Sequence, residues 1–459
     1  MRSRPAVLAL CCVGAFLAFL DATIVNIAFP AIERALKGPS LSTLSWVLNA
    51  YNVVIAASLV PAGRLADRLG RRRIFLIGLA VFTAASAACA AAPAVGWLIA
   101  ARVIQAVGAA LLLPSSLALM LPLFPAERRQ QAAAVWGAVA AVASGAGPTL
   151  GGVLIHWASW RWVFLVNVPI GIFAIVMTLR ALEESRAETP STPDVLGAVL
   201  LAVALGALAT GLVKGHEWGW TSAKVLIAFA VAVAGFVGGA LHAPRHPTPV
   251  LDPAVLKLRS VAVANVATIL FATAFFAATL NNVLFLTGSW GWSELHAGLA
   301  ITPTPLIAAL AAGPAGKIAD RYGASAVIVP GTIIYLIGML ITHAIAPKGP
   351  DFWGHWLPGM VLIGAGVGLA FPALGGAALQ GVPDRYFGVA SALNNTARTL
   401  GAVLGVSLLV VVISAAGPNP ATEAKHAWIF AGIVAIICGA VAAALPRPQP
   451  TPAPASASP

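Results

Sequence analysis

Charged residues are scarce in this sequence: only 9% of its 459 residues are Asp, Glu, Lys or Arg, whereas 59% are hydrophobic. Soluble domains carry about 25% charged residues, so this composition indicates a membrane protein with many spans. Polar stretches long enough to build a water-exposed catalytic domain are also missing. The basic residues are spread over short loops and do not form one face, which argues against binding of nucleic acid.

Metal-binding and catalytic patterns are missing as well. The four cysteines lie in apolar runs without C-x-x-C or His spacing that suits a metal: Cys11, Cys12, Cys89 and Cys438. We interpret them as small buried side chains, and we expect no metal site and no cofactor. Since no clustered nucleophile and base can be found either, we expect a protein that is not an enzyme.

Long apolar runs dominate the chain. Because a helix needs roughly 20 apolar residues to cross a bilayer, the sequence predicts fourteen transmembrane helices, at residues 6–29, 43–63, 74–92, 97–122, 132–155, 162–182, 195–213, 223–242, 261–287, 297–315, 325–346, 355–379, 388–415 and 427–445. An even number of spans places both termini on one side of the membrane. The distribution of Lys and Arg favours the cytoplasm for that side, and every tryptophan except Trp136 falls at a predicted outer end, where indole rings prefer to lie.

One sequence frame occurs twice, half a chain apart. The pattern G-x-x-x-D-R-x-G covers residues 63–70 and again 316–323, in each case between two apolar runs. The fourth and twelfth spans also match, Gly108 with Gly366 and Pro114 with Pro372. Spans 1–6 therefore correspond to spans 9–14. Repeated halves of this kind mark secondary transporters, whose binding sites lie between the halves near the middle of the membrane.

The repeat gives the predicted domain organisation of an all-α integral membrane protein. We expect a six-helix bundle at residues 1–187, two inserted transmembrane helices at 188–245 and a second six-helix bundle at 246–445. Residues 446–459 consist mainly of Pro, Ala, Ser and Thr, which cannot bury a core, so they are expected to form a disordered cytoplasmic tail.

Four motifs carry a family resemblance over nearly the whole chain. They are residues 20–30 (LDATIVNIAFP), 63–72 (GRLADRLGRR), 102–110 (RVIQAVGAA) and 147–152 (GPTLGG). Together they resemble the major facilitator superfamily, in its 14-span drug:proton antiporter branch. Ala106 stands where the third motif of the superfamily has glycine. The resemblance implies a major facilitator fold of two six-helix bundles plus two linker helices.

Asp21 and Arg102 are the predicted proton-coupling residues. Asp21 is the only carboxylate in any predicted span, and a charged group there is costly enough to be a functional candidate by default. Arg102 stays charged, and the resemblance ties its position to proton transfer, so we expect it to tune the protonation of Asp21. The alternatives are an Asp21 that caps polar groups or joins helices, and a structural Arg102 that bonds loop carbonyls.

The repeated frame is interpreted as a charged turn that forms a cytoplasmic gate. The predicted gate residues are Gly63, Asp67, Arg68, Gly70, Arg71, Arg72, Asp320 and Arg321. Asp67 can pair with arginines or cap a neighbouring helix, and such a cluster would latch the two halves together. The alternative is that the arginines only fix the topology of the chain.

The fourth motif predicts a hinge or a tight seal. Its residues Gly147, Pro148, Gly151 and Gly152 combine a helix breaker with small faces that let another helix approach closely. The resemblance associates this motif with antiport. Ordinary small-residue packing is the alternative reading.

Polar residues in several spans are candidates for a substrate cavity. We expect it to be lined by Asn26, Gln105, Asn281, Asn282, Asn394 and Arg398, although each of these alone is more often a packing contact. Ser391 shares a helical face with the last two.

The predicted function is proton-driven export of lipophilic drugs or toxic compounds by alternating access, powered by the proton gradient. An exporter of an endogenous antibiotic, siderophore or lipid is one alternative, and a proton-coupled nutrient importer is another. Because export of dications would need several buried acids, we expect neutral, monocationic or weakly acidic substrates. The expected partners are protons, a small lipophilic substrate and membrane lipids, for a monomer in the bacterial inner membrane.

Overall fold

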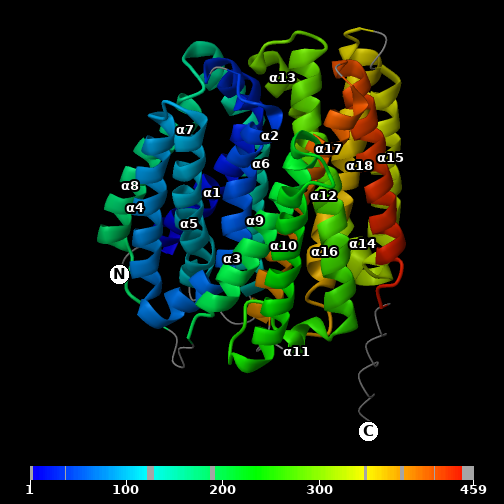
Figure 1. Ribbon diagram of the computed structural model, residues 1–459. Coiled ribbons are helices and arrows are strands. Elements are labelled where there is room, and N and C mark those ends of the chain that lie inside the picture. The colour runs from blue at the N-terminus through cyan, green and yellow to red at the C-terminus, as the bar shows by residue number, and fades with distance from the viewer. Residues whose placement is uncertain are drawn as a thin grey trace.

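The computed structural model of this protein describes residues 4–36, 38–120, 129–186, 192–345, 349–382, 387–417 and 419–446. Every regular element in those ranges is a helix, and the long helices run side by side (Figure 1). A lipid environment explains this, because a helix satisfies its own backbone hydrogen bonds where no water is present.

The helices fall into three successive groups. The first comprises α1 (Arg4–Ala35), α2 (Leu41–Leu44), α3 (Trp46–Leu69), α4 (Arg71–Ala90), α5 (Val95–Met120), α6 (Arg129–Trp157), α7 (Trp162–Leu165) and α8 (Asn167–Ala181). The second comprises α9 (Val195–Trp218), α10 (Ala223–His242) and the short η3 (Ala243–Arg245). The third comprises α11 (Pro253–Leu256), α12 (Arg259–Gly288), α13 (Glu294–Ile301), α14 (Pro303–Tyr322), α15 (Ser325–Ile345), η4 (Phe352–Trp356), α16 (Leu357–Ala377), α17 (Phe387–Ala416) and α18 (Pro420–Ala442).

The number of membrane helices agrees with the prediction. Among the described residues, 13 helical segments are long and apolar enough to cross a membrane. The remaining predicted span, 132–155, coincides with α6, a helix of 29 residues. The all-α membrane fold is therefore confirmed. The predicted tail lies outside the described residues except for Pro446, and the domain boundaries stay a prediction.

The repeated frame is helical, so its interpretation as a turn is wrong. Residues 63–69 form the end of α3, and α4 begins directly at Arg71. Only Gly70 turns the chain, with a φ of 116° that L-residues rarely adopt. The second copy has the same form, because α14 continues to Tyr322 and Gly323 makes the turn. The length of the apolar runs does not predict these helical extensions, because a helix can continue beyond the hydrocarbon core of the membrane where its polar residues face water.

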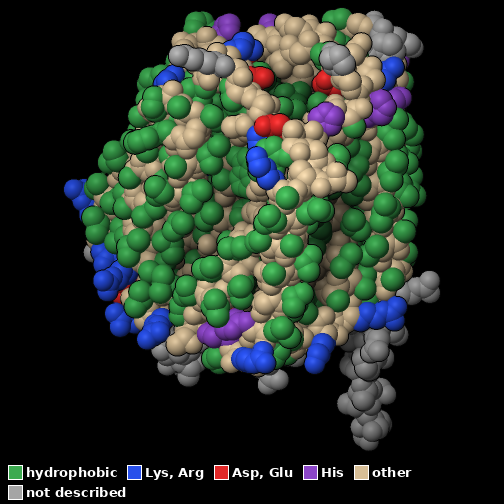
Figure 2. Space-filling model, in the orientation of Figure 1, with side chains coloured by type: hydrophobic (Ala, Val, Ile, Leu, Met, Phe, Trp, Pro, Cys, Tyr) green, Lys and Arg blue, Asp and Glu red, His purple; other side chains and the backbone are tan. Residues whose placement is uncertain are grey.

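The side that carries these two turns is called the motif side below, and the opposite side the far side. The motif side is the lower side in Figure 1, and the far side carries α2, α7 and α13. Lys and Arg gather along the lower rim of the visible face, whereas hydrophobic side chains cover the band above it (Figure 2).

The first and third helix groups form two halves that meet along several helices. Helix α1 contacts α12, α3 contacts α17, and α6 contacts α13 and α14. Helix α9 packs on α10 and also on α3 and α17, so the second group lies across the seam between the halves (Figure 1).

The matched glycines of the two halves do the same structural work. A Cβ on Gly108 in α5 would lie 2.6 Å from the backbone nitrogen of Phe82 in α4. A Cβ on Gly366 in α16 would lie 2.6 Å from the carbonyl oxygen of Gly331 in α15. Each glycine thus lets one pair of helices approach closely, and the sequence match reflects a structural repeat.

One apolar cluster joins the two halves on the far side. It combines Leu44 and Val47 of the first half with Leu280, Leu409 and other residues of the second. Two tryptophans expected at the lipid interface are instead fully buried near this side. Trp356 donates its indole N–H to the carbonyl of Ala300, and Trp428 donates to Asn282.

Candidate functional site

Asp21 of α1 and Arg102 of α5 form a buried ion pair. The side chains are 0% and 1% exposed, and Nη1 of Arg102 donates to Oδ2 of Asp21. Sequence alone left open whether these residues meet. Their contact supplies the partner that a charge inside a membrane needs, because removing one member of a buried pair costs about 3–5 kcal/mol.

Further polar groups complete the ion pair. Gln105 donates to Oδ1 of Asp21 at 2.8 Å and accepts from Nη1 of Arg102 at 2.7 Å. Asn167 of α8 also donates to Oδ1 of Asp21, at 3.2 Å, and Nε of Arg102 donates to the carbonyl of Val47 at 3.1 Å. Both charges are therefore satisfied by side chains and backbone from four helices.

Tyr51 of α3 separates this ion pair from a cavity. The guanidinium carbon of Arg102 lies 3.9 Å from the centroid of the Tyr51 ring, a favourable cation–π distance. The phenol hydroxyl donates to the carbonyl of Ala18 at 3.3 Å. Tyr51 also lines the cavity, whereas Asp21 and Arg102 do not. Tyr51 therefore contacts both the ion pair and the cavity.

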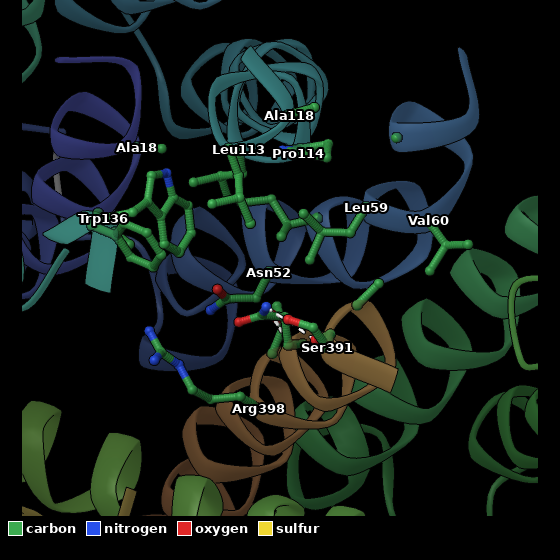
Figure 3. A pocket seen from close by; sticks show the side chains of 18 of the residues that line it. Ala18, Asn52, Leu59, Val60, Leu113, Pro114, Ala118, Trp136, Ser391 and Arg398 are labelled. Atoms are coloured by element: carbon green, nitrogen blue, oxygen red, sulfur yellow. Dashed lines mark hydrogen bonds between the residues drawn. The ribbon is translucent and has the colours of Figure 1, made fainter. Parts of the chain in front are cut away.

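The cavity has a volume of about 780 Å³ and lies between the two halves on the motif side. Its wall is formed by α1, α3, α4, α5 and α6 of the first half and by α12 and α17 of the second. It reaches from Phe19 and Arg398 to Arg64, Asp67 and Arg71 at the end of α3 and the start of α4. Figure 3 shows Arg398 and Asn52 extending toward the same space, with Trp136 beside it.

Only one of the six predicted cavity residues, Arg398, lines this cavity. The other five make packing contacts elsewhere. Gln105 belongs to the ion-pair network, Asn26 bonds carbonyls of its own helix, Asn281 donates to the carbonyl of Ala424, Asn282 accepts from Trp428, and Asn394 donates to Asn265 and Thr268. These amides satisfy buried groups between helices, an outcome that residue type alone cannot separate from a cavity role.

Sequence reasoning missed several lining residues, among them Tyr51, Asn52 and Trp136. Trp136 carried a signal, because it was the one tryptophan away from the predicted outer ends. In the structure its indole N–H donates to Ser116 at 3.0 Å, and its ring packs edge-on against Phe19. A tryptophan in mid-span has to find such a polar partner.

The first copy of the repeated frame forms an ion pair within its own half. Oδ1 of Asp67 accepts from Nε and Nη2 of Arg71, at 3.1 and 3.0 Å. Of the other predicted gate residues, Gly63 lines the cavity, Arg72 donates to the carbonyl of Leu179, and Arg68, Asp320 and Arg321 are exposed. The latch between halves therefore stays a prediction.

The cap of α4 is Glu184, which sequence reasoning did not select. Its carboxylate accepts from the backbone N–H groups of Arg72 and Arg73, at 3.0 and 3.1 Å. These are the donors that a helix leaves unsatisfied at its start. Gly70 precedes the helix and has no side chain to cap it, and a Cβ there would lie 2.6 Å from the Glu184 carboxylate. Of the two roles considered for Asp67, it takes the ion pair and Glu184 takes the cap.

We predict that Glu184→Ala destabilises the protein by about 1 kcal/mol, the usual loss for a missing N-terminal cap. The melting temperature of the detergent-purified protein measures it. Glu183→Ala removes the neighbouring exposed carboxylate and is the matched control. Equal melting temperatures for the two variants would contradict the capping role.

The glycines of the fourth motif make close contacts on two sides of α6. Cβ atoms on Gly147 and Gly151 would overlap Thr23 and Ile27 of α1. A Cβ on Gly152 would lie 2.6 Å from the carbonyl oxygen of Glu294, at the start of α13 in the other half.

The same contact zone continues across the far side. A Cβ on Gly298 of α13 would lie 2.4 Å from the carbonyl oxygen of Pro148. Thr149 and Thr302 share a hydrogen bond, and Arg34 pairs with Glu294. Helices α1 and α6 thus pack closely against α13 and α14, and the motif supplies the small residues of this contact. Its role as a seal stays a prediction. The hinge role of Pro148 stays a prediction.

We predict that Gly152→Ala loosens this seal, because the new methyl group meets backbone atoms that cannot rotate away. Overpacking of this kind costs about 1–3 kcal/mol, which a lower melting temperature would report. The control is Gly206→Ala in α9, where a Cβ meets nothing within 4 Å. Alanine has a higher helix propensity than glycine, so the control should melt no lower than the wild type. A Gly152→Ala variant with the same melting temperature as the control would contradict the seal.

Comparisons with known proteins agree with this architecture. A sequence model described as Major Facilitator Superfamily matches residues 11–197 and 264–459. The interval between the two matches contains most of α9 and all of α10. An auto-inhibited POT family peptide transporter of known structure superimposes with a TM-score of 0.69, covering 96% of each chain, at 16% identity, which is evidence of fold alone.

Three curated relatives are 32–34% identical to this chain over the aligned residues. The tetracenomycin C resistance and export protein of Streptomyces glaucescens is 32% identical over 90% of this chain and 76% of its own length. The multidrug resistance protein Stp of Mycobacterium tuberculosis is 33% identical over 88% and 74%. The methylenomycin A resistance protein of Bacillus subtilis is 34% identical over 89% and 87%.

Proposed function

This chain belongs to the major facilitator superfamily, and from that premise we propose that it exports lipophilic drug-like compounds in exchange for protons. It is a transporter and not an enzyme. Export is supported by the relatives, whose names describe resistance to, or export of, antibiotics. The relatives from Streptomyces glaucescens and Bacillus subtilis are each named for a single antibiotic, so a dedicated exporter is the alternative.

The motif side is proposed to face the cytoplasm of a bacterium. The Lys and Arg residues along that rim support this orientation, since cytoplasmic loops of membrane proteins are enriched in them (Figure 2). Both termini then lie in the cytoplasm, and the cavity opens inward while the far side is sealed. A substrate could enter from the cytoplasm and leave once the seal between α6 and α13 has parted.

One observation supports the proton coupling: a fully buried carboxylate that, among the described residues, forms its ion pair with a fully buried arginine. Protonation of Asp21 would remove its charge and leave the charge of Arg102, which cannot deprotonate, without its counterion. That change is large enough to bias two conformations, because a broken buried pair costs about 3–5 kcal/mol.

Tyr51 is the proposed link between proton and substrate. Its ring packs on Arg102 and at the same time lines the cavity. Release of Arg102 from Asp21 would remove the support of that ring and let it move into the cavity, so that protonation and substrate occupancy exclude each other. The proton gradient then drives export without a cofactor, in a monomer surrounded by membrane lipids.

We predict that Asp21→Asn abolishes proton-coupled export while the protein still folds. In proteoliposomes with an imposed pH gradient, the wild type should release protons into the vesicle lumen when substrate moves the other way, and the variant should not. Melting temperature serves as the folding control, and the variant is expected to melt lower because Arg102 loses its partner.

A double variant separates coupling from stability. Asp21→Asn combined with Arg102→Gln leaves no uncompensated charge, so its melting temperature should recover toward the wild type while coupling stays absent. Unchanged proton exchange in Asp21→Asn would remove Asp21 from the mechanism. Substrate efflux that continues unchanged after the gradient has collapsed would reject proton-driven export altogether.

A further inference from the structure

The charges that line the cavity are unequal in sign. Four charged side chains contribute to its wall: three arginines, Arg64, Arg71 and Arg398, and one carboxylate, Asp67. Asp67 is already paired with Arg71 at the motif end. The cavity therefore has an excess of positive charge, although exporters of cationic drugs would need the opposite sign.

Arg398 is the cation on this wall that lies away from the motif end, where Arg64 and Arg71 lie. It comes from α17, and its guanidinium carbon lies 5.5 Å from the ring centroid of Phe19 in α1 and 5.6 Å from that of Phe371 in α16. Within the described ranges, the ion pairs of this protein do not include Arg398. The other mid-membrane arginine, Arg102, has the carboxylate of Asp21.

This difference between the two arginines needs a physical reason. A guanidinium within a membrane protein is costly and cannot shed its proton. Contacts with two phenyl rings offset only part of that cost. An anion that enters the cavity would supply the missing counterion, and it would bind in the fork geometry that guanidinium offers to a carboxylate.

The surroundings of Arg398 suit a flat apolar body with one acidic group. Asn52 extends toward the same space as Arg398, from the facing half (Figure 3). Phe19, Trp136 and Phe276 add aromatic faces to the wall. The ring of Trp136 is fixed by its hydrogen bond to Ser116, so it is preorganised for stacking.

We propose that this cavity selects lipophilic aromatic weak acids in their anionic form, with Arg398 as the residue that binds the acidic group. This inference rests on the proposed export function and narrows its substrate class. It excludes monocationic substrates, which a single buried acid could otherwise bind. That acid, Asp21, lies behind Tyr51 and is already paired with Arg102.

Three probes with one tricyclic scaffold test the preference for an anion: anthracene-2-carboxylate, anthracene-2-carboxamide and anthracen-2-ylmethylammonium. Their equilibrium binding to the purified full chain is measured by fluorescence anisotropy. The wild type should bind the carboxylate at least about tenfold more tightly than the ammonium compound, the effect of one good charge-assisted hydrogen bond.

Variants of Arg398 and of one arginine outside the cavity assign the effect to one residue. Arg398→Gln should lose about tenfold in carboxylate affinity and leave amide binding within about twofold, because the amide does not need the charge. Arg398→Lys keeps the charge without the fork and should fall between wild type and Arg398→Gln. Arg180→Gln removes an exposed arginine of α8 that does not line the cavity and is the matched control, with little effect on either probe.

Several outcomes would overturn the proposal. One is a wild type that binds the ammonium compound as tightly as the carboxylate, and another is a wild type that does not bind the carboxylate at all. A third is an Arg398→Gln variant whose affinity falls equally for the carboxylate and for the amide. Binding does not depend on a proton gradient, so these measurements test the substrate class independently of the proposed export. If anion binding holds but the pH gradient drives no transport in vesicles, only the proposed function fails.

Discussion

The ion pair between Asp21 and Arg102 is the interaction on which the first half of this protein is organised. Both side chains are withdrawn from water and from the cavity, and residues of α3, α5 and α8 supply their remaining hydrogen bonds. Each group is tolerable only while the other is charged and in place. Protonation of one carboxyl group is therefore a local event with consequences for the packing of four helices.

Arg102 of the first half and Arg398 of the second half differ in their surroundings. Arg102 has an internal counterion and is separated from the cavity by Tyr51, whereas Arg398 faces the cavity, lies near two phenyl rings and has no ion-pair partner among the described residues. The first half thus holds a closed charge pair suited to proton exchange. The second half presents an open charge suited to a ligand. Helix α6 packs closely against α13 on the far side, whereas the cavity extends to the motif side.

Much of this arrangement was predictable from sequence, because apolar run length and repeated motifs report directly on helices in a bilayer. The helices and the repeat came from such signals. Asp21 was selected as the one carboxylate in a predicted span and Arg102 through the family resemblance, and their role in proton coupling stays a prediction. The cavity wall did not, since Asn281, Asn282 and Asn394 look like ligands but satisfy groups between helices. Glu184 escaped notice because its role depends on a helix start more than a hundred residues earlier in the chain. Contacts of that range follow from tertiary packing and have no local pattern.

The central claim is that occupancy of the cavity and protonation of Asp21 exclude each other. The most direct measurement is calorimetric titration of a transported substrate into the purified protein in buffers of different ionisation enthalpy, which counts protons released on binding. The account predicts that the wild type releases protons as substrate binds and that Asp21→Asn releases none. Substrate binding without proton release in the wild type, or equal release by the variant, would contradict it.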